Sequence, residues 1–353
     1  MKGKILIVGA TGKTGRLTLD KMSNLGQNIT IGGRDSSSLE FLARKYDVPY
    51  IVLDIKDKEK LIAIFKDFNI IINLVGPFIN FGYIPVEAAI AAKVHYLDSS
   101  WEQEFIYKLD AYRYSAIENS VAIIPGVGVS PGISDLMVAA GYKEFDECHN
   151  ISIYYVEGMK NRFSYGTLIS AANALKSQSL FFSEGQFVPI KAGDKIKDFV
   201  FNNKYKHQIL FSYPSGDIVN IPRYIKTESV ECFFGVESLT RLFLILGKLP
   251  FNTDSIIIRT ICKFSEKLQP LIFYGNIGFT ISVEINGILN GKNTTKHFSI
   301  ISDEDPYSAT SNLLTHAAKH LIESKTKTVG ITSPGQTFNS IELLNDSGLN
   351  ISF

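Results

Sequence analysis

Short apolar runs alternate with amphipathic stretches through the first 125 residues of the chain. The apolar runs are rich in β-branched residues and carry few charges, which is typical of buried parallel strands. They predict strands at 4–8, 28–32, 50–54, 70–75, 94–98 and 121–124. The stretches between them predict helices at 13–25, 36–46, 57–67, 82–92 and 101–118. This alternation indicates an α/β fold with a doubly wound parallel sheet.

The pattern changes from about residue 151, where polar and apolar residues begin to alternate singly. This alternation indicates an antiparallel sheet with one exposed face, packed on the other side by a helix at 167–176. The dipeptide Asn290-Gly291 predicts a tight hairpin within this sheet. The chain returns to helix at 306–323, where apolar residues line one face. The strands predicted in this part of the chain are 255–265, 279–289 and 296–302.

Composition and charge narrow the class of protein. With 353 residues the chain is long enough for two domains, and its net charge of +1 argues against nucleic acid or an anionic membrane as the main partner. Cys148, Cys232 and Cys262 lie far apart and form no C-x-x-C pair, so we expect neither a disulfide framework nor a metal site. The first residues lack the pattern of a signal peptide, and we therefore expect a cytoplasmic protein.

Two segments are apolar enough to suggest a membrane contact. Residues 68–86 carry no charge but include several Asn, Gly and Pro residues, which indicates a strand, a loop and a helix start. The run Leu242–Leu246 is too short to span a membrane and lies between Arg241 and Lys248. It favours an interdomain or dimer surface over a superficial membrane contact. We expect no stable membrane insertion, and we expect a homodimer.

A glycine-rich turn follows the first predicted strand. Gly9, Gly12 and Gly15 lie in the sequence GATGKTG, and an amphipathic helix follows at once. Glycines at this spacing let backbone N–H groups approach a pyrophosphate and let the helix pack close to the strand. The strand before and the helix after the turn are the context that a dinucleotide-binding fingerprint requires. The other residues of the turn expected to contact the cofactor are Thr11, Lys13 and Thr14.

The end of the second strand distinguishes the two forms of a nicotinamide cofactor. NAD sites place a carboxylate here for the ribose 2′-OH, whereas NADP sites place a cation against the 2′-phosphate. Arg34 follows two glycines, and the hydroxyl of Ser36 lies close by in sequence. Asp35 would repel a phosphate if it faced the pocket, but it also suits the N-cap of the helix at 36–46. The sequence therefore favours NADP, with NAD as the alternative.

The fourth strand ends in the sequence NLVGPF at 73–78. Because the carboxyl ends of parallel strands meet at one edge of the sheet, a substrate and the nicotinamide would meet here. Further residues predicted to line the cofactor at this edge are Asp54, Val75, Gly76 and Pro77.

Several motifs follow one another in a characteristic order along the chain. They are GATGKTGR at 9–16, GGR at 32–34, VGPF at 75–78, HYLD at 95–98, PGISD at 131–135, YGT at 165–167 and GITSP at 330–334. Their order and spacing resemble the saccharopine dehydrogenase-like reductases over nearly the whole chain. Two positions depart from the family pattern, since Trp101 stands where glycine is usual and Lys93 replaces another common glycine.

The resemblance implies an activity and a split architecture. Its members include NADP-linked saccharopine reductases and trans-acting enoyl reductases. It implies a Rossmann domain at 1–135 and an inserted α+β domain with an antiparallel sheet at 136–302, which would cover the substrate and form dimer contacts. The segment 303–353 would then pack back onto the Rossmann domain.

Hydride transfer requires a donor for the negative charge or the amine that develops on the substrate. His95, Tyr96 and Asp98, around the end of the fifth strand, and Tyr165, at the start of a helix expected to face the cleft, are the catalytic candidates. Each residue of the fifth strand also has a structural interpretation. His95 and Tyr96 suit the strand–helix junction, and Asp98 suits a helix cap.

Other chemistries receive little support. His316 and His320 lie one helical turn apart but lack the glutamate of an H-E-x-x-H site, which favours an ordinary helix face over a metal site. The chain has no G-x-S-x-G elbow and no P-loop lysine motif, which argues against a hydrolase or an NTPase.

The favoured hypothesis is an NADP-dependent oxidoreductase that transfers hydride between the nicotinamide and a C=N bond of a small, amino-acid-derived substrate. One alternative is a trans-acting enoyl reductase, which would act on a C=C bond. A second alternative is a non-catalytic nucleotide-binding sensor or scaffold. The sequence alone does not separate reduction of C=N from reduction of C=C.

Overall fold

The structure is a computed structural model that describes residues 3–174, 178–237, 260, 262–264, 268–269, 274–324 and 328–352. The chain forms two compact units, the first comprising Met1–Leu136 and Tyr307–Gly348 and the second comprising Met137–Pro306 and Leu349–Phe353. The predicted division places all of 303–353 with the first unit and differs from this grouping at the end of the chain. Ser352 exchanges two backbone hydrogen bonds with Ser299, and this pairing joins the last residues to the second unit.

The first unit contains a parallel sheet of seven strands in the order β15-β6-β5-β4-β1-β2-β3. The α/β prediction is confirmed, and the strand boundaries lie close to the predicted ones. The apolar centres of β1 and β4 are completely or almost completely buried, as expected for a sheet with helices on both faces. The strands are β1 (Lys4–Val8), β2 (Asn28–Gly33), β3 (Tyr50–Val52), β4 (Ile70–Asn73), β5 (His95–Asp98), β6 (Ala122–Ile124) and β15 (Gly330–Ile331).

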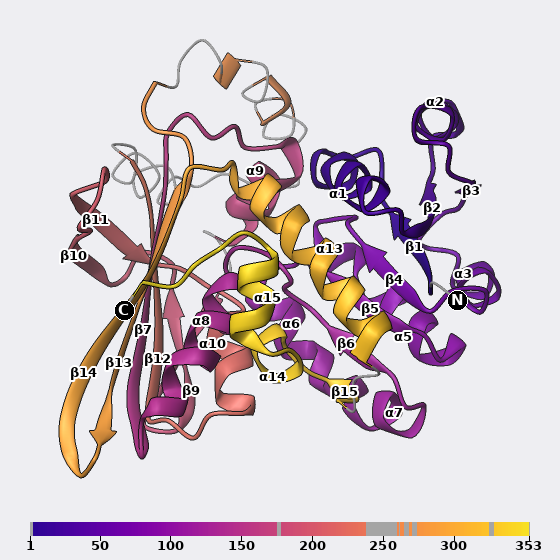
Figure 1. Cartoon of the computed structure of the whole chain (residues 1–353). Coiled ribbons are helices and arrows are strands. Elements are labelled where there is room, and N and C mark those ends of the chain that lie inside the picture. Colours follow the sequence, from indigo (N-terminus) through magenta and orange to yellow (C-terminus); the bar gives the residue numbers. More distant parts are fainter. Residues whose placement is uncertain are drawn as a thin grey trace. The chain divides into compact units, whose positions relative to one another are not determined.

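The helices of the first unit come from both ends of the chain (Figure 1). The long α13 (Pro306–Ser324) contacts α1 (Lys13–Asn24), because the Ser311 hydroxyl donates to the Thr14 carbonyl at 3.3 Å. The C-terminal segment therefore completes this unit through direct contacts. The other helices are α2 (Ser36–Tyr46), α3 (Lys58–Phe65), α4 (Phe78–Phe81), α5 (Tyr83–Ala92), α6 (Gln103–Lys108), α7 (Arg113–Glu118), α14 (Pro334–Thr337) and α15 (Ser340–Asp346). The division between the two units falls within α8 (Ile133–Gly141).

The second unit is built on a mixed sheet of eight strands. Its main path runs β10-β11-β12-β7-β13-β14, while β8 pairs with β12 and β9. The pairs are antiparallel except for β12 with β7, so the predicted antiparallel sheet contains one parallel pair. The strands are β7 (Glu147–Glu157), β8 (Gln178–Ser183), β9 (Gln186–Lys191), β10 (Ile196–Val200), β11 (His207–Ser212), β12 (Ser229–Val236), β13 (Phe279–Leu289) and β14 (Lys292–Ser302).

Two local predictions in the second unit have different outcomes. The hairpin is confirmed, since β13 and β14 are joined by Asn290 and Gly291, both with positive φ (51° and 73°) as a two-residue turn requires. The strand predicted at 255–265 is wrong where the structure describes it, because Cys262–Phe264 are helical. Apolar residues at 258, 261 and 262 fit a helix as well as a strand, and so short a pattern does not separate the two.

The helix predicted at 167–176 is α9 (Tyr165–Ala174), and a short α10 (Asp217–Asn220) follows β11.

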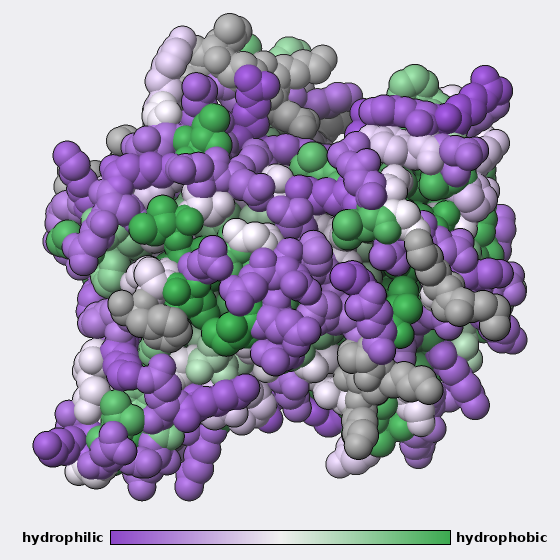
Figure 2. All heavy atoms as spheres, viewed as in Figure 1, coloured by the Kyte–Doolittle hydropathy of each residue, from purple (hydrophilic) through white to green (hydrophobic). Residues whose placement is uncertain are grey.

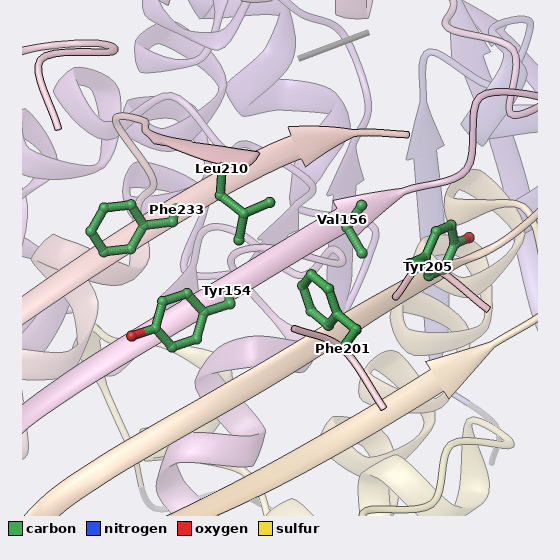
Figure 3. Close-up of a cluster of buried hydrophobic side chains, with 6 residues drawn as sticks. All are labelled: Tyr154, Val156, Phe201, Tyr205, Leu210 and Phe233. Atoms are coloured by element: carbon green, nitrogen blue, oxygen red, sulfur yellow. The ribbon is translucent and has the colours of Figure 1, made fainter. Parts of the chain in front are cut away.

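Aromatic side chains form the core on one face of the second sheet (Figure 3). The ring of Tyr154 stacks on Phe199 with ring centroids 4.0 Å apart, and on Phe233 with centroids 5.7 Å apart. Both partners come from other strands, so this stacking ties β7 to β10 and β12. The buried members of the cluster are Tyr154, Val156, Phe201, Tyr205, Leu210 and Phe233.

No helix in the part of the chain that the structure describes is long and apolar enough to cross a membrane. Hydrophilic residues dominate the face shown in Figure 2, where apolar residues form separate small groups. The apolar run Leu242–Leu246 lies outside the described residues.

Candidate functional site

The strand order locates the place in the first sheet where a ligand is expected to bind. From β1 the chain moves outward through β2 and β3, and then crosses to β4 on the other side of β1. The loops after β1 and β4 therefore flank the point where the strand order reverses. In open parallel sheets, ligands bind at the carboxyl ends of the strands at this point.

Two glycines of the turn after β1 are required by the fold itself. Gly9 has a φ of +88°, and a Cβ there would lie 2.9 Å from the Val75 side chain. A Cβ on Gly15 would lie 2.3 Å from the Gly9 carbonyl oxygen and 2.7 Å from the Ala10 Cα. Neither position accepts a side chain without moving backbone, because these contacts join α1 to β1 and the two loops to each other.

Gly12 and Gly76 differ from these two glycines, because the protein leaves space beside them. Gly12 is exposed, has ordinary extended dihedrals, and a Cβ there would have only the Gly9 carbonyl oxygen within 4 Å, at 3.4 Å. Gly76 is also exposed, and a Cβ there would meet nothing closer than the Phe78 ring at 3.6 Å. Packing does not require glycine at either position, whereas a cofactor lying against the backbone would.

The start of α1 presents the groups that bind a pyrophosphate. Gly12 is its N-cap and provides no side-chain hydrogen bond, and the first turn carries no acidic residue. The N–H groups at this end of the helix can thus donate hydrogen bonds to an anionic ligand, and the helix dipole favours one. Lys13 lies in the same turn, with its Nζ 3.7 Å from the centre of the Tyr307 ring. Together with Thr11 and Thr14, the predicted residues of this turn surround one helix end.

The end of β2 assigns different roles to Arg34 and Asp35. Asp35 is the N-cap of α2, and its carboxylate accepts hydrogen bonds from the N–H groups and the hydroxyls of Ser37 and Ser38. The Ser38 and Ser37 hydroxyls contribute most to lowering the pKa of Asp35 to about 2. Arg34 is exposed and forms no ion pair with any residue in the described ranges, and Ser36 is exposed beside it. The capping interpretation of Asp35 thus leaves Arg34 as the charged group available to a ligand.

The remaining predicted cofactor residues lie at the same edge. Asp54 follows β3 and is exposed, and its carboxylate accepts from the Lys56 N–H at 3.0 Å. Val75, Gly76 and Pro77 form the loop between β4 and α4, where the Val75 N–H donates to Asn73 Oδ1 at 3.1 Å. The structure therefore brings all the predicted cofactor residues to the carboxyl edge of one sheet.

The three catalytic candidates of the HYLD motif lie at different depths of this sheet. Tyr96 is completely buried, and its hydroxyl accepts from Asn73 Nδ2 at 3.0 Å. Asp98 ends β5 at the carboxyl edge and is also completely buried, and its Oδ1 accepts from the N–H groups of Ser100 (2.9 Å) and Gly126 (3.0 Å). Burial raises the pKa of Asp98 to about 6 and that of Tyr96 well above its usual value. Neither group is exposed, so neither is placed to contact a ligand directly.

His95 lies at the other edge of the sheet. It pairs in register with Ile70, the first residue of β4, whereas Asp98 pairs with Asn73, the last. A strand rises about 3.3 Å per residue, so about 10 Å separates the two ends of this tetrapeptide. The His95 Nδ1 accepts from the Ala122 N–H at 3.0 Å, and burial lowers its pKa, which favours this neutral acceptor form. His95 therefore does not join the candidate site, and its role is to hold β5 to β6.

Tyr165 belongs to the second unit, where it is the first residue of α9 and 38% exposed. Ser164 precedes it, and its hydroxyl accepts from the Thr167 N–H at 3.3 Å and pairs with the Thr167 hydroxyl at 3.1 Å. A substrate contact by Tyr165 stays a prediction.

Glu102 is a residue of the site that the sequence analysis did not select. Its carboxylate accepts from the Phe78 N–H at 2.9 Å and from the Trp101 N–H at 3.3 Å, and the residue is buried. It therefore fixes the end of the Val75–Pro77 loop and the start of α4. An acidic residue just after a buried strand was the available signal, but its partner 24 positions away was not visible in the sequence.

Comparison with known proteins supports a nucleotide-binding site in the first part of the chain. Residues 5–119 match the family described as the saccharopine dehydrogenase NADP binding domain. The match confirms the resemblance drawn from the motifs, and it confirms NADP as the predicted cofactor of this part of the chain.

The whole chain also shares its fold with a solved structure. The apo saccharopine dehydrogenase (L-Glu forming) of Saccharomyces cerevisiae superposes with a TM-score of 0.69 at 15% identity, covering 99% of each chain. At this identity the likeness concerns the fold alone.

Curated relatives match over shorter stretches. A trans-acting enoyl reductase of Mycobacterium tuberculosis is 29% identical over 147 residues, which is 39% of this chain and 35% of that protein. A lipid droplet localized protein of Caenorhabditis elegans is 26% identical over 155 residues, 40% of this chain and 36% of that protein. The chain thus spans little more than a third of the length of these relatives.

Proposed function

We propose that this protein is an NADP-dependent oxidoreductase whose cofactor lies across the carboxyl edge of the first sheet. The observation that carries the proposal is the open space beside Gly12 at the start of α1. The protein itself does not need glycine there, and the neighbouring helix end offers N–H groups to a pyrophosphate. Arg34 would bind the 2′-phosphate, and Gly76 with Pro77 would lie against the nicotinamide.

The cofactor, when bound, supplies a hydride to the substrate. The chain contributes binding and orientation: the first turn of α1 holds the phosphates, and the loop of Val75–Pro77 sets the position of the nicotinamide end. Asn73 holds this loop through the Val75 N–H, and Glu102 holds the start of α4, just after the loop, through the Phe78 N–H. Tyr165 is the proposed proton donor on the substrate side.

The proposed substrate is a small molecule with an amino-acid-derived C=N bond. A second candidate is a C=C bond of an enoyl compound, which the name of the M. tuberculosis relative supports. The two chemistries require the same hydride donor and differ in the acceptor. The test is therefore consumption of NADPH, followed at 340 nm, with a panel of imines, of keto acids with amino acids, and of enoyl thioesters.

Binding of the cofactor is measured separately from turnover. Trp101 is the only tryptophan of the chain and lies just after β5, so quenching of its fluorescence reports NADPH binding. Binding with turnover of one substrate class supports the enzyme and identifies the chemistry. Binding without turnover of any class would favour the sensor or scaffold alternative, and no binding of NADPH or NADH would reject the proposal.

A homodimer and a cytoplasmic location are further proposals, which originate in the sequence analysis. Light scattering of the purified protein measures the mass, and a mass near 39 kDa, that of a single chain, would reject the dimer. Fractionation of cells that express the chain tests the location.

A further inference from the structure

Two buried polar side chains meet in the interior of the first sheet, beneath the loop that follows β4. Asn73 ends β4 and Tyr96 lies on β5, and both are completely buried. Tyr96 pairs in register with Ile71, which shares a face of β4 with Asn73 because strand residues two apart point to the same side. From this position the Tyr96 hydroxyl reaches the end of β4, where it accepts from Asn73 Nδ2 at 3.0 Å.

The Asn73 amide joins this hydroxyl to the backbone of the loop. Its Oδ1 accepts from the Val75 N–H at 3.1 Å, the bond that an asparagine side chain often makes with the backbone two residues on. The Val75 N–H can only donate, so the carbonyl side of the amide faces the loop and its NH₂ group faces Tyr96. Each polar atom of the Asn73 side chain thus has one hydrogen-bond partner within the described residues.

Burial makes the orientation of this amide depend on Tyr96. A buried polar group is costly to the fold unless it is hydrogen-bonded. Without the Tyr96 oxygen, the Asn73 NH₂ group would have no acceptor within the described residues, and orientations of the amide that release Val75 would no longer be disfavoured. The Tyr96 hydroxyl therefore holds the amide in the orientation that the loop requires.

Val75 lies between two points of the loop that are anchored in other ways. Before it, the Leu74 N–H donates to the last carbonyl of β1 at 2.9 Å, and after it the Phe78 N–H donates to Glu102 at 2.9 Å. The Val75 side chain also borders the glycine-rich turn, since a Cβ on Gly9 would lie 2.9 Å from it. A shift of Val75 therefore changes the gap between the two loops that flank the proposed cofactor.

We propose that Tyr96 is a positioning residue for the nicotinamide end of the cofactor site, which acts through the Asn73 amide on the backbone of Val75. This inference rests on the proposed function, because it concerns the same site. Arg34, the proposed partner of the 2′-phosphate, follows β2, and β1 separates β2 from β4 in the sheet. A change at Val75 should therefore affect the nicotinamide end of the cofactor and spare the adenosine end.

Tyr96→Phe tests this role by removing a single oxygen atom. We expect it to weaken NADPH binding about five- to tenfold, the effect of leaving one buried NH₂ group without its acceptor. The second ligand is adenosine 2′,5′-bisphosphate, which carries the adenine and the 2′-phosphate but no nicotinamide. We expect its affinity to stay within about twofold of the wild-type value, because it binds away from Val75. Calorimetry measures both affinities, and a general loss of structure would weaken both.

Two variants supply matched controls. The Tyr83 hydroxyl is buried in the same unit and has no hydrogen-bond partner within the described residues, so Tyr83→Phe removes the same atom without affecting Asn73. We expect wild-type affinity for both ligands from this variant. Arg34→Ala should give a different pattern and weaken the binding of both ligands, since both carry the 2′-phosphate.

Asn73→Leu tests whether Tyr96 acts through Asn73. This substitution keeps a similar volume and removes both hydrogen bonds of the amide. We expect it to weaken NADPH binding at least as much as Tyr96→Phe and to spare the binding of adenosine 2′,5′-bisphosphate. The double variant should bind NADPH no worse than Asn73→Leu alone, because both substitutions act through one pathway.

The outcomes separate this inference from the proposed function. If the wild type binds neither NADPH nor NADH, the proposed function fails and the inference fails with it. If the wild type binds NADPH and Tyr96→Phe binds it as well as Tyr83→Phe does, only the positioning role is wrong. Equal weakening of both ligands by Tyr96→Phe, or full addition of the two effects in the double variant, would also overturn it. Should Tyr96→Phe not fold, Asn73→Leu decides the question by the same comparison of the two ligands.

Discussion

The two edges of the first sheet use their residues in different ways. At the amino edge, polar side chains join neighbouring strands: Asn69 Oδ1 accepts from the Lys4 N–H at 2.8 Å, and His95 accepts from the Ala122 N–H. At the carboxyl edge, exposed glycines border open space, and Arg34 is exposed without an ion pair in the described residues. Asn69 and His95 at the amino edge are thus satisfied by the fold, whereas Arg34 at the carboxyl edge remains available to a ligand. The comparison predicts that substitutions at the first edge affect stability and those at the second affect binding.

The largest expected effect tests this distinction within a single motif. Gly15→Val places a side chain against the Gly9 and Ala10 backbone, and we expect a loss of several kcal/mol of folding free energy. In Gly12→Val the new Cβ has only the Gly9 carbonyl oxygen within 4 Å, so we expect a melting temperature near that of the wild type but NADPH binding at least tenfold weaker. Calorimetry and Trp101 fluorescence measure the two properties. Equal losses of stability in both variants would contradict the distinction.

Asp98 should make stability depend on pH. Its pKa is about 6 in the folded protein and 3.8 ordinarily, so folding disfavours the ionised form. The stability that the protonated Asp98 carboxyl contributes is fully present below about pH 4 and is lost as the pH rises through about 6. This loss corresponds to roughly 3 kcal/mol of folding free energy. We therefore measure the free energy of unfolding with denaturant at pH 4 and at pH 8. Between these two values, the free energy of unfolding of the wild type should fall by up to this much more than that of Asp98→Asn. Parallel curves for the two proteins would show that Asp98 ionises normally.

Arg34→Ala should reduce the affinity for NADPH and spare that for NADH. A charge-assisted contact to the 2′-phosphate contributes about 1.5–3 kcal/mol, so we expect the Michaelis constant for NADPH to rise roughly ten- to a hundredfold. Ser36→Ala should give a smaller change in the same direction. If the wild type prefers NADH, or if Arg34→Ala weakens the affinity for both cofactors equally, Arg34 does not determine the cofactor specificity.

His95→Ala should behave as a substitution at the amino edge. It leaves the Ala122 N–H without its acceptor, and we expect a loss of about 1–2 kcal/mol in unfolding experiments. His95→Asn retains an acceptor at a similar position and should recover part of this stability. We expect NADPH binding and turnover within twofold of the wild type for both variants. A hundredfold drop in turnover at unchanged stability would instead indicate that His95 is a catalytic residue.

The smallest expected effect concerns a departure from the family pattern at the amino edge. Lys93 ends α5 with a left-handed φ of 59°, a conformation that glycine adopts without strain. We expect Lys93→Gly to stabilise the protein by about 0.5–1 kcal/mol with no change in NADPH binding. Lys93→Ala keeps the strain and is the control. An equal gain from both variants would attribute the effect to the charge of Lys93.

The sequence by itself determined the first sheet and the identity of its cofactor turn. The centres of β1 and β4 are uniformly apolar because both faces of the sheet are buried there, and the turn after β1 carries glycine for reasons that are local to it. Hairpin β13–β14 was predictable for the same reason, since Asn290-Gly291 favours positive φ at both positions. In the second unit, alternation indicated strands but not their partners, so the parallel pairing of β7 with β12 was not predicted.

Only the tertiary structure decided which residues of a motif act together. His95 and Asp98 are three positions apart in sequence, yet the register of β5 against β4 places them at opposite edges of the sheet. The roles of Glu102 and Asn73 depend on backbone N–H groups of a loop, whose positions follow from the packing of β4, α4 and β5. Periodicity reports which residues are buried, because burial depends on local spacing. Hydrogen-bond partners far apart in the chain depend on strand order, which local spacing does not specify.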